Sequence, residues 1–202
     1  RLPTTVPHRL ADTPAYLHYP GENGRVVYTE GLFTGYRWYE ARDIDVAFPF
    51  GHGLSYTRFE WGTPTVDAPD TVADLETGRP VVVTVAVRNV GDRAGSEVVQ
   101  AYVGCDAPRL SRPARELRGL AKVRLEPGEE REVELVLDHR AFTYWDPGDP
   151  SYAELADAAP VAAGAGAERR TEAGWVVDSG IHRIHLGASS ADIRAVATVD
   201  LA

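Results

Sequence analysis

The side chains best suited to acid–base or nucleophilic chemistry in the first part of this chain are carboxylates. They are Glu22, Glu30, Glu40, Asp43 and Asp45. A carboxylate acts as a general acid, a general base or a nucleophile only where its surroundings adjust its pKa. The simpler interpretation is a solvated group or a surface ion pair with Arg37 or Arg42, and such pairs contribute only ~0–1 kcal/mol. We favour this interpretation and assign no catalytic residue to the chain.

Histidine is the second candidate, as a metal ligand. His182 and His185 are three residues apart in a predicted strand. Their side chains then point to opposite faces, which argues against a shared metal ion. His52 lies between two glycines, where we expect a turn. The sequence contains no phosphate-binding loop, dinucleotide fingerprint or nucleophile elbow, so it predicts neither a metal site nor a cofactor.

Composition restricts the partners further. The net charge is −9 and the isoelectric point is about 5.1, which disfavours nucleic acid and anionic membranes as partners. No apolar run approaches the ~20 residues of a membrane span. A single cysteine, Cys105, excludes a disulfide within the chain, and we expect its side chain to be buried or half-buried rather than reactive. The chain has no methionine and begins at Arg1, so we expect a fragment or a processed product.

The chain changes character near residue 62. Twelve of its aromatic residues lie at or before Trp61, in a segment rich in glycine and weakly periodic. Tyr36, Trp38 and Tyr39 have helical spacing, and we predict a short helix over residues 30–41 with Thr29 as its cap. These rings can stack on sugars, but packing in a core or between domains is the simpler interpretation. We therefore expect the aromatic segment to dock on another part of the protein.

After residue 80 the pattern is that of β-strands. Alternating apolar and polar side chains, with turn residues between the runs, predict strands at residues 81–88, 97–103, 116–125, 132–137, 174–177, 181–186 and 193–201. We expect residues 174–177 and 181–186 to form a hairpin. Residues 147–173 are rich in Ala, Gly and Pro and are predicted to be a loop insertion. The fold class expected is all-β, a β-sandwich.

Several motifs in a fixed order resemble glycoside hydrolase family 3. Residues 24–61 include TEGLFTGYRWYEA and PFGHGLSY and resemble the end of that family's second domain. VRNVGDRAGSEVVQAYVG, RELRGLAKVRLEPGEE and GWVVDSGIHRIHLGASSADIR resemble its C-terminal fibronectin-III-like domain. The resemblance covers almost the whole chain, apart from the insertion at residues 147–173.

The resemblance implies a division of the chain and a function. Residues 1–61 would be the irregular, aromatic-rich tail of an α/β sandwich domain with its linker. Residues 62–202 would be an immunoglobulin-like sandwich of the fibronectin type III kind. Family members are retaining β-glucosidases and related exo-glycosidases, whose two carboxyl groups lie about 5–5.5 Å apart. Both of these groups belong upstream of Arg1, and we carry neither over to this chain.

Two functions follow as hypotheses. In the first, the chain is a structural portion of a retaining exo-acting β-glycosidase. A place for Glu30 or Glu40 near its sugar site is the less favoured interpretation of these carboxylates, and we assign no substrate-binding residue. The partners of the chain are then the remainder of that hydrolase and an oligosaccharide or glycoside substrate. In the second, the chain is a non-catalytic sandwich that binds carbohydrate or protein. A free-standing module does not need residues 1–61, so this aromatic segment favours the first hypothesis.

Overall fold

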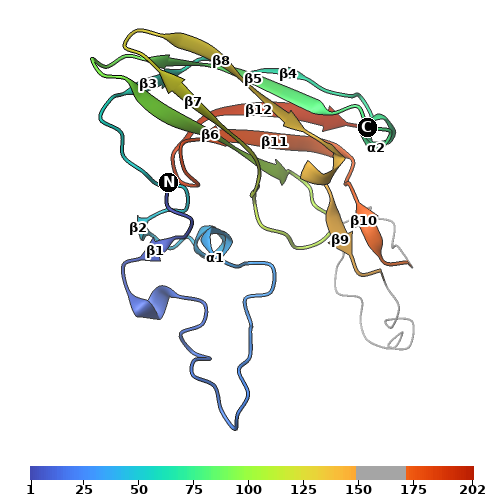
Figure 1. Ribbon diagram of the computed structural model, residues 1–202. Coiled ribbons are helices and arrows are strands. Elements are labelled where there is room, and N and C mark those ends of the chain that lie inside the picture. Colours follow the sequence, from blue (N-terminus) through green and yellow to red (C-terminus); the bar gives the residue numbers. More distant parts are fainter. Residues whose placement is uncertain (149–171) are drawn as a thin grey trace.

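Two antiparallel sheets packed face to face form the larger part of the structure, a computed structural model that describes residues 1–148 and 172–202 (Figure 1). The first sheet has the order β12-β11-β6-β7. In the second, β5 is central, with β8 along one edge and β3 and β4 along the other. The predicted all-β sandwich is confirmed.

The strands of the sandwich differ in length. The first sheet contains β6 (Gly95–Cys105), β7 (Glu116–Leu125), β11 (Gly180–Gly187) and β12 (Ile193–Leu201). The second contains β3 (Phe59–Trp61), β4 (Thr65–Asp67), β5 (Val81–Asn89) and β8 (Glu130–Leu137). The predicted runs at 116–125 and 193–201 coincide with β7 and β12.

The core lies between the sheets and follows from strict alternation. The inward positions of β5 are Val81, Val83, Val85 and Val87, and all four are buried. In β8 the glutamates alternate outward with buried Val133, Leu135 and Leu137. Each fully buried aliphatic side chain contributes about 1.5–3 kcal/mol relative to an exposed one. The alternation read from the sequence therefore defines the core face of both strands.

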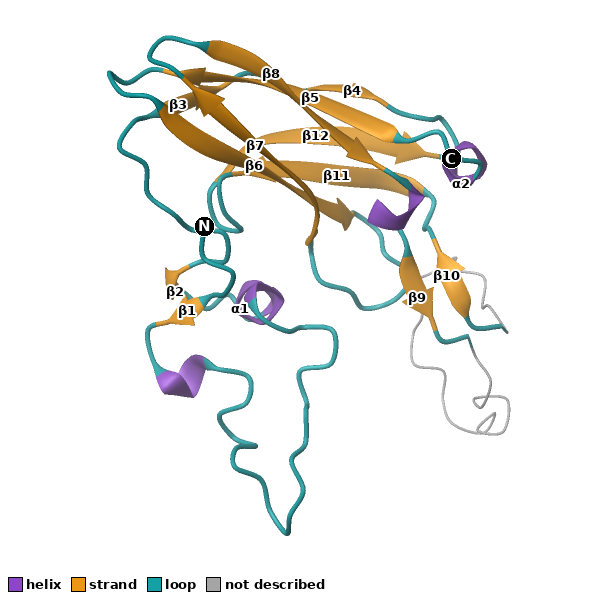
Figure 2. Cartoon of the chain, in the orientation of Figure 1, coloured by secondary structure: helices purple, strands orange, loops and turns teal. Residues whose placement is uncertain are grey.

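A short helix closes one end of the sandwich. The hydroxyl of Thr71 caps α2 (Val72–Glu76) by accepting a hydrogen bond from the Asp74 backbone N–H at 3.1 Å. Leu75 of this helix is fully buried. Backbone bonds join Ala202 to Asp70 and Val72, so the C-terminal residue is fixed beside α2 (Figure 2).

The hairpin predicted over residues 174–186 is wrong. β10 (Gly174–Val176) pairs with β9 (Tyr144–Asp146) in a separate two-stranded sheet, while β11 pairs with β6 and β12. Local turn residues suggested a hairpin, but hydrogen-bond partners come from distant segments. β9 follows a one-turn 3-10 helix, His139–Ala141. Of the predicted insertion at 147–173, residues 149–171 lie outside the described part.

The first 58 residues contain few regular elements. β1 (Val6–Pro7) pairs with β2 (Val46–Phe48), and a 3-10 helix spans Leu10–Asp12. α1 spans only Tyr36–Ala41, so the helix predicted from residue 30 with a Thr29 cap is wrong at its start. Gly31 and Gly35 have φ of 55° and 60°. A right-handed α-helix requires negative φ, so the helix cannot include these glycines. The irregular character expected of this segment is confirmed.

Between the short helices, residues 13–35 run away from the sandwich and return (Figure 1). The excursion brings α1 back beneath the sheet that contains β6 and β7. None of the helices in residues 1–148 and 172–202 has the length and apolar character of a membrane span.

Candidate functional site

The leading segment, residues 1–58, meets the sandwich in a cluster of aromatic rings. Tyr36 of α1 is buried, stacks on Phe50 with 5.1 Å between ring centroids, and meets the edge of Tyr102 at 5.7 Å. Its hydroxyl accepts a hydrogen bond from the backbone N–H of Leu117 in β7 at 2.8 Å. We call this contact region, with the charged pairs described next, the junction. The interpretation of Tyr36 and Tyr39 as packing residues is confirmed, since both are buried within this chain.

Beneath the rings lies a buried polar chain. Tyr102 in β6 is fully buried and donates from its hydroxyl to Gln100 Oε1 at 2.6 Å. Gln100 in turn donates from Nε2 to the carbonyl oxygen of Ala188 at 2.6 Å. Burial raises the pKa of Tyr102 far above its ordinary value, so this phenol stays neutral. The chain of bonds satisfies groups that water does not reach.

Two reciprocal ion pairs complete the junction. The Arg115 Nη2 lies 2.8 Å from Glu40 Oε1, and the Arg37 Nη2 lies 3.2 Å from Glu116 Oε1. Burial raises the pKa of Glu40, and the charge of Arg115 opposes that shift. Arg115 also donates to the carbonyl oxygen of Ser190 at 3.0 Å. Glu40 therefore pairs with an arginine, as the simpler interpretation holds, but the partner is Arg115 rather than Arg37 or Arg42.

The other sequence candidates are spread along the segment. Glu22 is exposed in the turn that its backbone forms with Arg25. Asp43 and Asp45 are exposed after α1, whereas Glu30 is partly buried before it.

Arg42 lies over the ring of Trp38, 5.2 Å from its centroid. The indole N–H of Trp38 donates to the carbonyl oxygen of Asp12 at 3.0 Å, so Trp38 also serves packing.

Several hollows with distinct linings lie among the described residues. One of about 270 Å³ at the junction is bordered by Tyr39, Glu40 and Arg115. One of about 730 Å³ lies in the outward excursion and is bordered by Leu17, Tyr19 and Val27.

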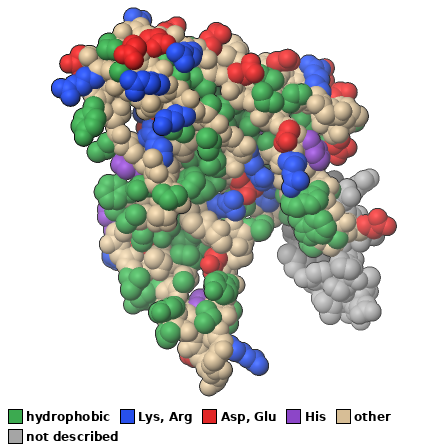
Figure 3. Space-filling model, in the orientation of Figure 1, with side chains coloured by type: hydrophobic (Ala, Val, Ile, Leu, Met, Phe, Trp, Pro, Cys, Tyr) green, Lys and Arg blue, Asp and Glu red, His purple; other side chains and the backbone are tan. Residues whose placement is uncertain are grey.

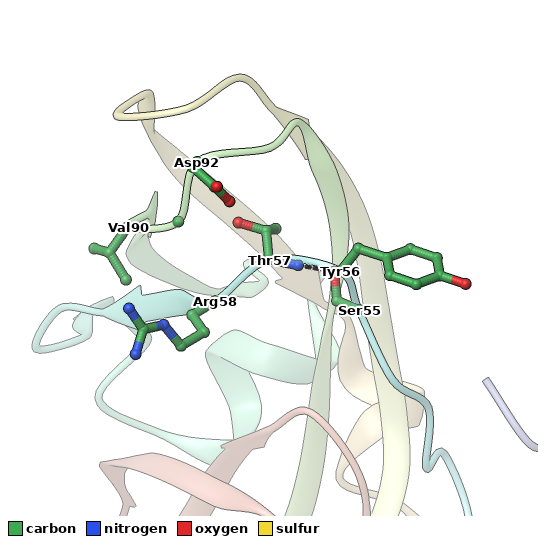
Figure 4. A pocket seen from close by; sticks show the side chains of 7 residues that line it. Ser55, Tyr56, Thr57, Arg58, Val90 and Asp92 are labelled. Atoms are coloured by element: carbon green, nitrogen blue, oxygen red, sulfur yellow. Dashed lines mark hydrogen bonds between the residues drawn. The ribbon is translucent and has the colours of Figure 1, made fainter.

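A third hollow, of about 620 Å³, opens at one end of the sandwich (Figure 4). Thr57 and Arg58 line it on one side, and Val90 and Asp92 line it on the other. Thr57 donates from its hydroxyl to Asn89 Oδ1 at 2.5 Å, and the same oxygen accepts from the Gly91 N–H. These bonds shape the turn after β5.

The histidines and the cysteine have structural settings. His182 is buried and His185 is only partly buried, on opposite faces of β11, as predicted. His52 forms a turn, since its N–H donates to the Pro49 carbonyl oxygen at 3.1 Å. Cys105 is half-buried, and burial raises the pKa of its thiol. Among the described residues no three His, Cys, Asp or Glu side chains gather as a metal site.

The outward excursion carries a large apolar surface. Figure 3 shows hydrophobic side chains along it. Leu17 is 84% exposed and Tyr28 is 82% exposed. Other exposed hydrophobic residues of the excursion are Tyr16, Tyr19, Val26, Val27 and Leu32. We call this set the apolar face; surfaces of this kind mark sites of association.

Sequence reasoning missed several residues that the structure brings together. Arg115 and Glu116 stand in the motif RELRG, but nothing local shows that they face α1 across the fold. Trp145 and Trp175 lie opposite each other in the β9–β10 pair, with 5.6 Å between their centroids. The sequence Tyr144-Trp145-Asp146 has no apolar–polar alternation that would have indicated a strand there.

Comparison with known proteins adds a consistent set of relatives. The family model described as fibronectin type III-like domain matches residues 97–155. Thermostable beta-glucosidase B of Acetivibrio thermocellus is 42% identical over 193 residues, covering 96% of this chain and 22% of the relative. Probable beta-glucosidase I of Aspergillus fumigatus is 45% identical over 145 residues, covering 72% of this chain and 17% of the relative.

The solved structures that resemble this chain are also β-glucosidases. A glycoside hydrolase family 3 β-glucosidase from Bifidobacterium adolescentis has a TM-score of 0.77 at 35% identity, covering 98% of this chain and 25% of that one. The β-glucosidase from Kluyveromyces marxianus, solved with glucose, has a TM-score of 0.78 at 36% identity, covering 98% of this chain and 20% of that one. The chain thus spans less than a quarter of the length of the curated relatives named above.

Proposed function

Because the chain belongs to glycoside hydrolase family 3 and matches its C-terminal part, we propose that it is a structural portion of a β-glucosidase. The parent enzyme removes terminal β-linked sugars from oligosaccharides or glycosides, with retention at the anomeric carbon. The two carboxyl groups of that mechanism belong to the remainder of the parent.

The observation that carries this proposal is the apolar face. Tyr28 and Leu17 project from an excursion that returns to α1, and α1 is fixed to the sandwich by the junction. The excursion is therefore anchored at its base while its outer surface lacks a cover within the described residues. The remainder of the parent, several times longer than this chain in the relatives, supplies such a cover.

The state of Glu40 supports a structural role for the chain. Glu40 was one of two carboxylates considered for a place near a sugar, but its Oε1 accepts two hydrogen bonds from Arg115. These bonds favour the charged form of Glu40 against the burial that raises its pKa, and they direct the carboxylate toward the sandwich. The division into residues 1–61 and 62–202 remains part of the proposal, with β3 already paired to β5 where the two parts join.

The alternative, a free-standing binding module, differs in whether the apolar face is exposed to water or buried. A free module leaves a surface of this size in water, which disfavours solubility. An integral portion of a hydrolase buries it against the remainder of the enzyme.

The test is complementation. The chain is expressed alone and together with the upstream part of its parent, and hydrolysis of an aryl β-glucoside is assayed. We expect no turnover by the chain alone and turnover by the pair. A double variant, Leu17→Ser with Tyr28→Ser, should lower complementation at least about tenfold, because two large anchors leave the interface.

The matched control is Leu120→Ser, which changes an exposed leucine on β7 of the sandwich and should leave complementation unchanged. Turnover by the chain alone would show that the catalytic groups are misplaced here. Full complementation by the double variant would show that the apolar face is not the docking surface.

A further inference from the structure

Two tryptophans form an exposed corner on the small sheet of β9 and β10. Trp145 and Trp175 are directly opposite each other in the register, so their side chains project on the same side. Their centroids lie 5.6 Å apart with 73° between the ring planes. Trp145 is 52% exposed and Trp175 is 60% exposed. Both rings are therefore partly open to a ligand.

The corner stands on a fixed base. The neighbours that point to the opposite side, Tyr144, Asp146 and Val176, are buried. The Tyr144 hydroxyl donates to Asp178 Oδ1 at 2.7 Å, and the Arg112 guanidinium lies 4.3 Å from the centroid of the Tyr144 ring. Rigid support of this kind lowers the entropy cost of binding to the exposed rings.

The size of the corner fits a small ligand. With about 250 Å² for a fully exposed tryptophan, the two rings offer roughly 300 Å². One side of a stable protein complex buries about 800 Å². The corner is thus too small to hold a protein partner alone, but it matches one or two rings of a small molecule.

The charges beneath the corner fit a neutral ligand. Arg109 forms an ion pair with Asp146, and the Arg112 Nη1 lies 3.5 Å from Asp178 Oδ2. Each of these two arginines is therefore matched by a carboxylate. A neutral, amphipathic ring with an apolar face and polar edges suits such a site.

We infer that Trp145 and Trp175 form a binding site for a neutral sugar ring, which stacks on one indole and abuts the edge of the other. The choice of sugar as the ligand class rests on the proposed function.

The test follows the four tryptophan side chains by NMR. The 202-residue chain, labelled with ¹⁵N, is titrated with cellotetraose and with laminaritetraose, and the indole N–H signals are recorded. The signals of Trp145 and Trp175 should move and saturate with at least one of the two sugars, while those of Trp38 and Trp61 stay in place. Sorbitol, which has hydroxyl groups but no ring, should move none of them.

Variants separate stacking from loss of structure. Trp175→Ala should weaken binding about tenfold or more, which corresponds to about 1.4 kcal/mol. Trp175→Tyr keeps an aromatic face and should restore most of the affinity. Tyr56→Ala removes an exposed ring elsewhere in the chain and should have no effect. Circular dichroism checks that each variant is folded.

Either of two results would overturn the inference: silent Trp145 and Trp175 signals with both sugars, or unchanged binding by folded Trp175→Ala. If the Trp145 and Trp175 signals do not move but the parent enzyme hydrolyses β-glucosides, only this binding site is refuted. If sugar binds here but the chain combined with its upstream part does not hydrolyse the β-glucoside, the proposed function is refuted and the site remains.

Discussion

Arg115 holds a single oxygen of Glu40 through two hydrogen bonds, from Nε at 3.0 Å and from Nη2 at 2.8 Å, across 75 positions of sequence. Both side chains are mostly buried. One end of this pair lies in α1 and the other lies just before β7, so the pair ties the leading segment to the sandwich. Removing one partner leaves the other charge buried, which costs more than the pair contributes.

We expect Arg115→Ala to destabilise the junction by about 1–3 kcal/mol, the cost of a partly buried charge left unsatisfied. Burial raises the pKa of Glu40, and loss of Arg115 raises it further. A raised folded pKa disfavours folding once the carboxylate ionises. The cost should therefore be small below about pH 4 and complete at neutral pH. Urea unfolding at both pH values measures it.

The control for this prediction is Arg183→Ala. Arg183 donates two hydrogen bonds of 2.7 Å to Asp106 on the surface, and loss of an exposed pair costs only ~0–1 kcal/mol. Equal destabilisation by the two variants would contradict a special role for the junction.

Gly51 offers a second test of the junction. Its φ is 79°, and a Cβ there would collide with the side-chain amide of Gln100, the residue that holds Tyr102. We expect Gly51→Ala to cost more than the ~1–2 kcal/mol of the backbone conformation alone. Gly31→Ala is the matched control, because Gly31 has φ of 55° and open space at the Cβ position. If the two variants have the same free energy of unfolding, the contact with Gln100 carries no energy.

His182 should make the sandwich less stable in acid. Its ring is buried against Phe142, and no hydrogen bond to its Nε2 is formed within the described residues. Burial lowers the pKa of His182, so the unfolded chain binds a proton at a higher pH than the folded chain. Stability from this group is complete above about pH 6.5 and is lost as pH falls toward the folded pKa, by about 1.4 kcal/mol per unit of lowering.

The measurement is the free energy of unfolding at pH 7.5 and at pH 5. His182→Leu should show a smaller decline than the native chain. Some decline should remain, because burial also lowers the pKa of His185 on the same strand. His8→Ala changes an exposed histidine and should keep the native decline. A His182→Leu variant with the full native decline would contradict this assignment.

Sequence patterns predicted those elements whose structure depends on alternation alone. β5, β7, β8 and β12 were predicted with bounds correct to within two residues, because a strand with one buried face must alternate. β9 was not predicted, because three residues carry too little periodicity. The helix over residues 30–41 was predicted too long. Helical spacing outweighed two glycines, Gly31 and Gly35, whose positive φ prevents the helix from beginning before Tyr36.

By itself, the sequence determined the all-β sandwich, its core valines and the separate character of the aromatic leading segment, since burial and alternation are local in the chain. Only the tertiary structure decided which partners those residues have. It paired β10 with β9, Glu40 with Arg115 and Trp145 with Trp175. Such pairings depend on which distant segments meet, and that is fixed by the packing of the whole chain.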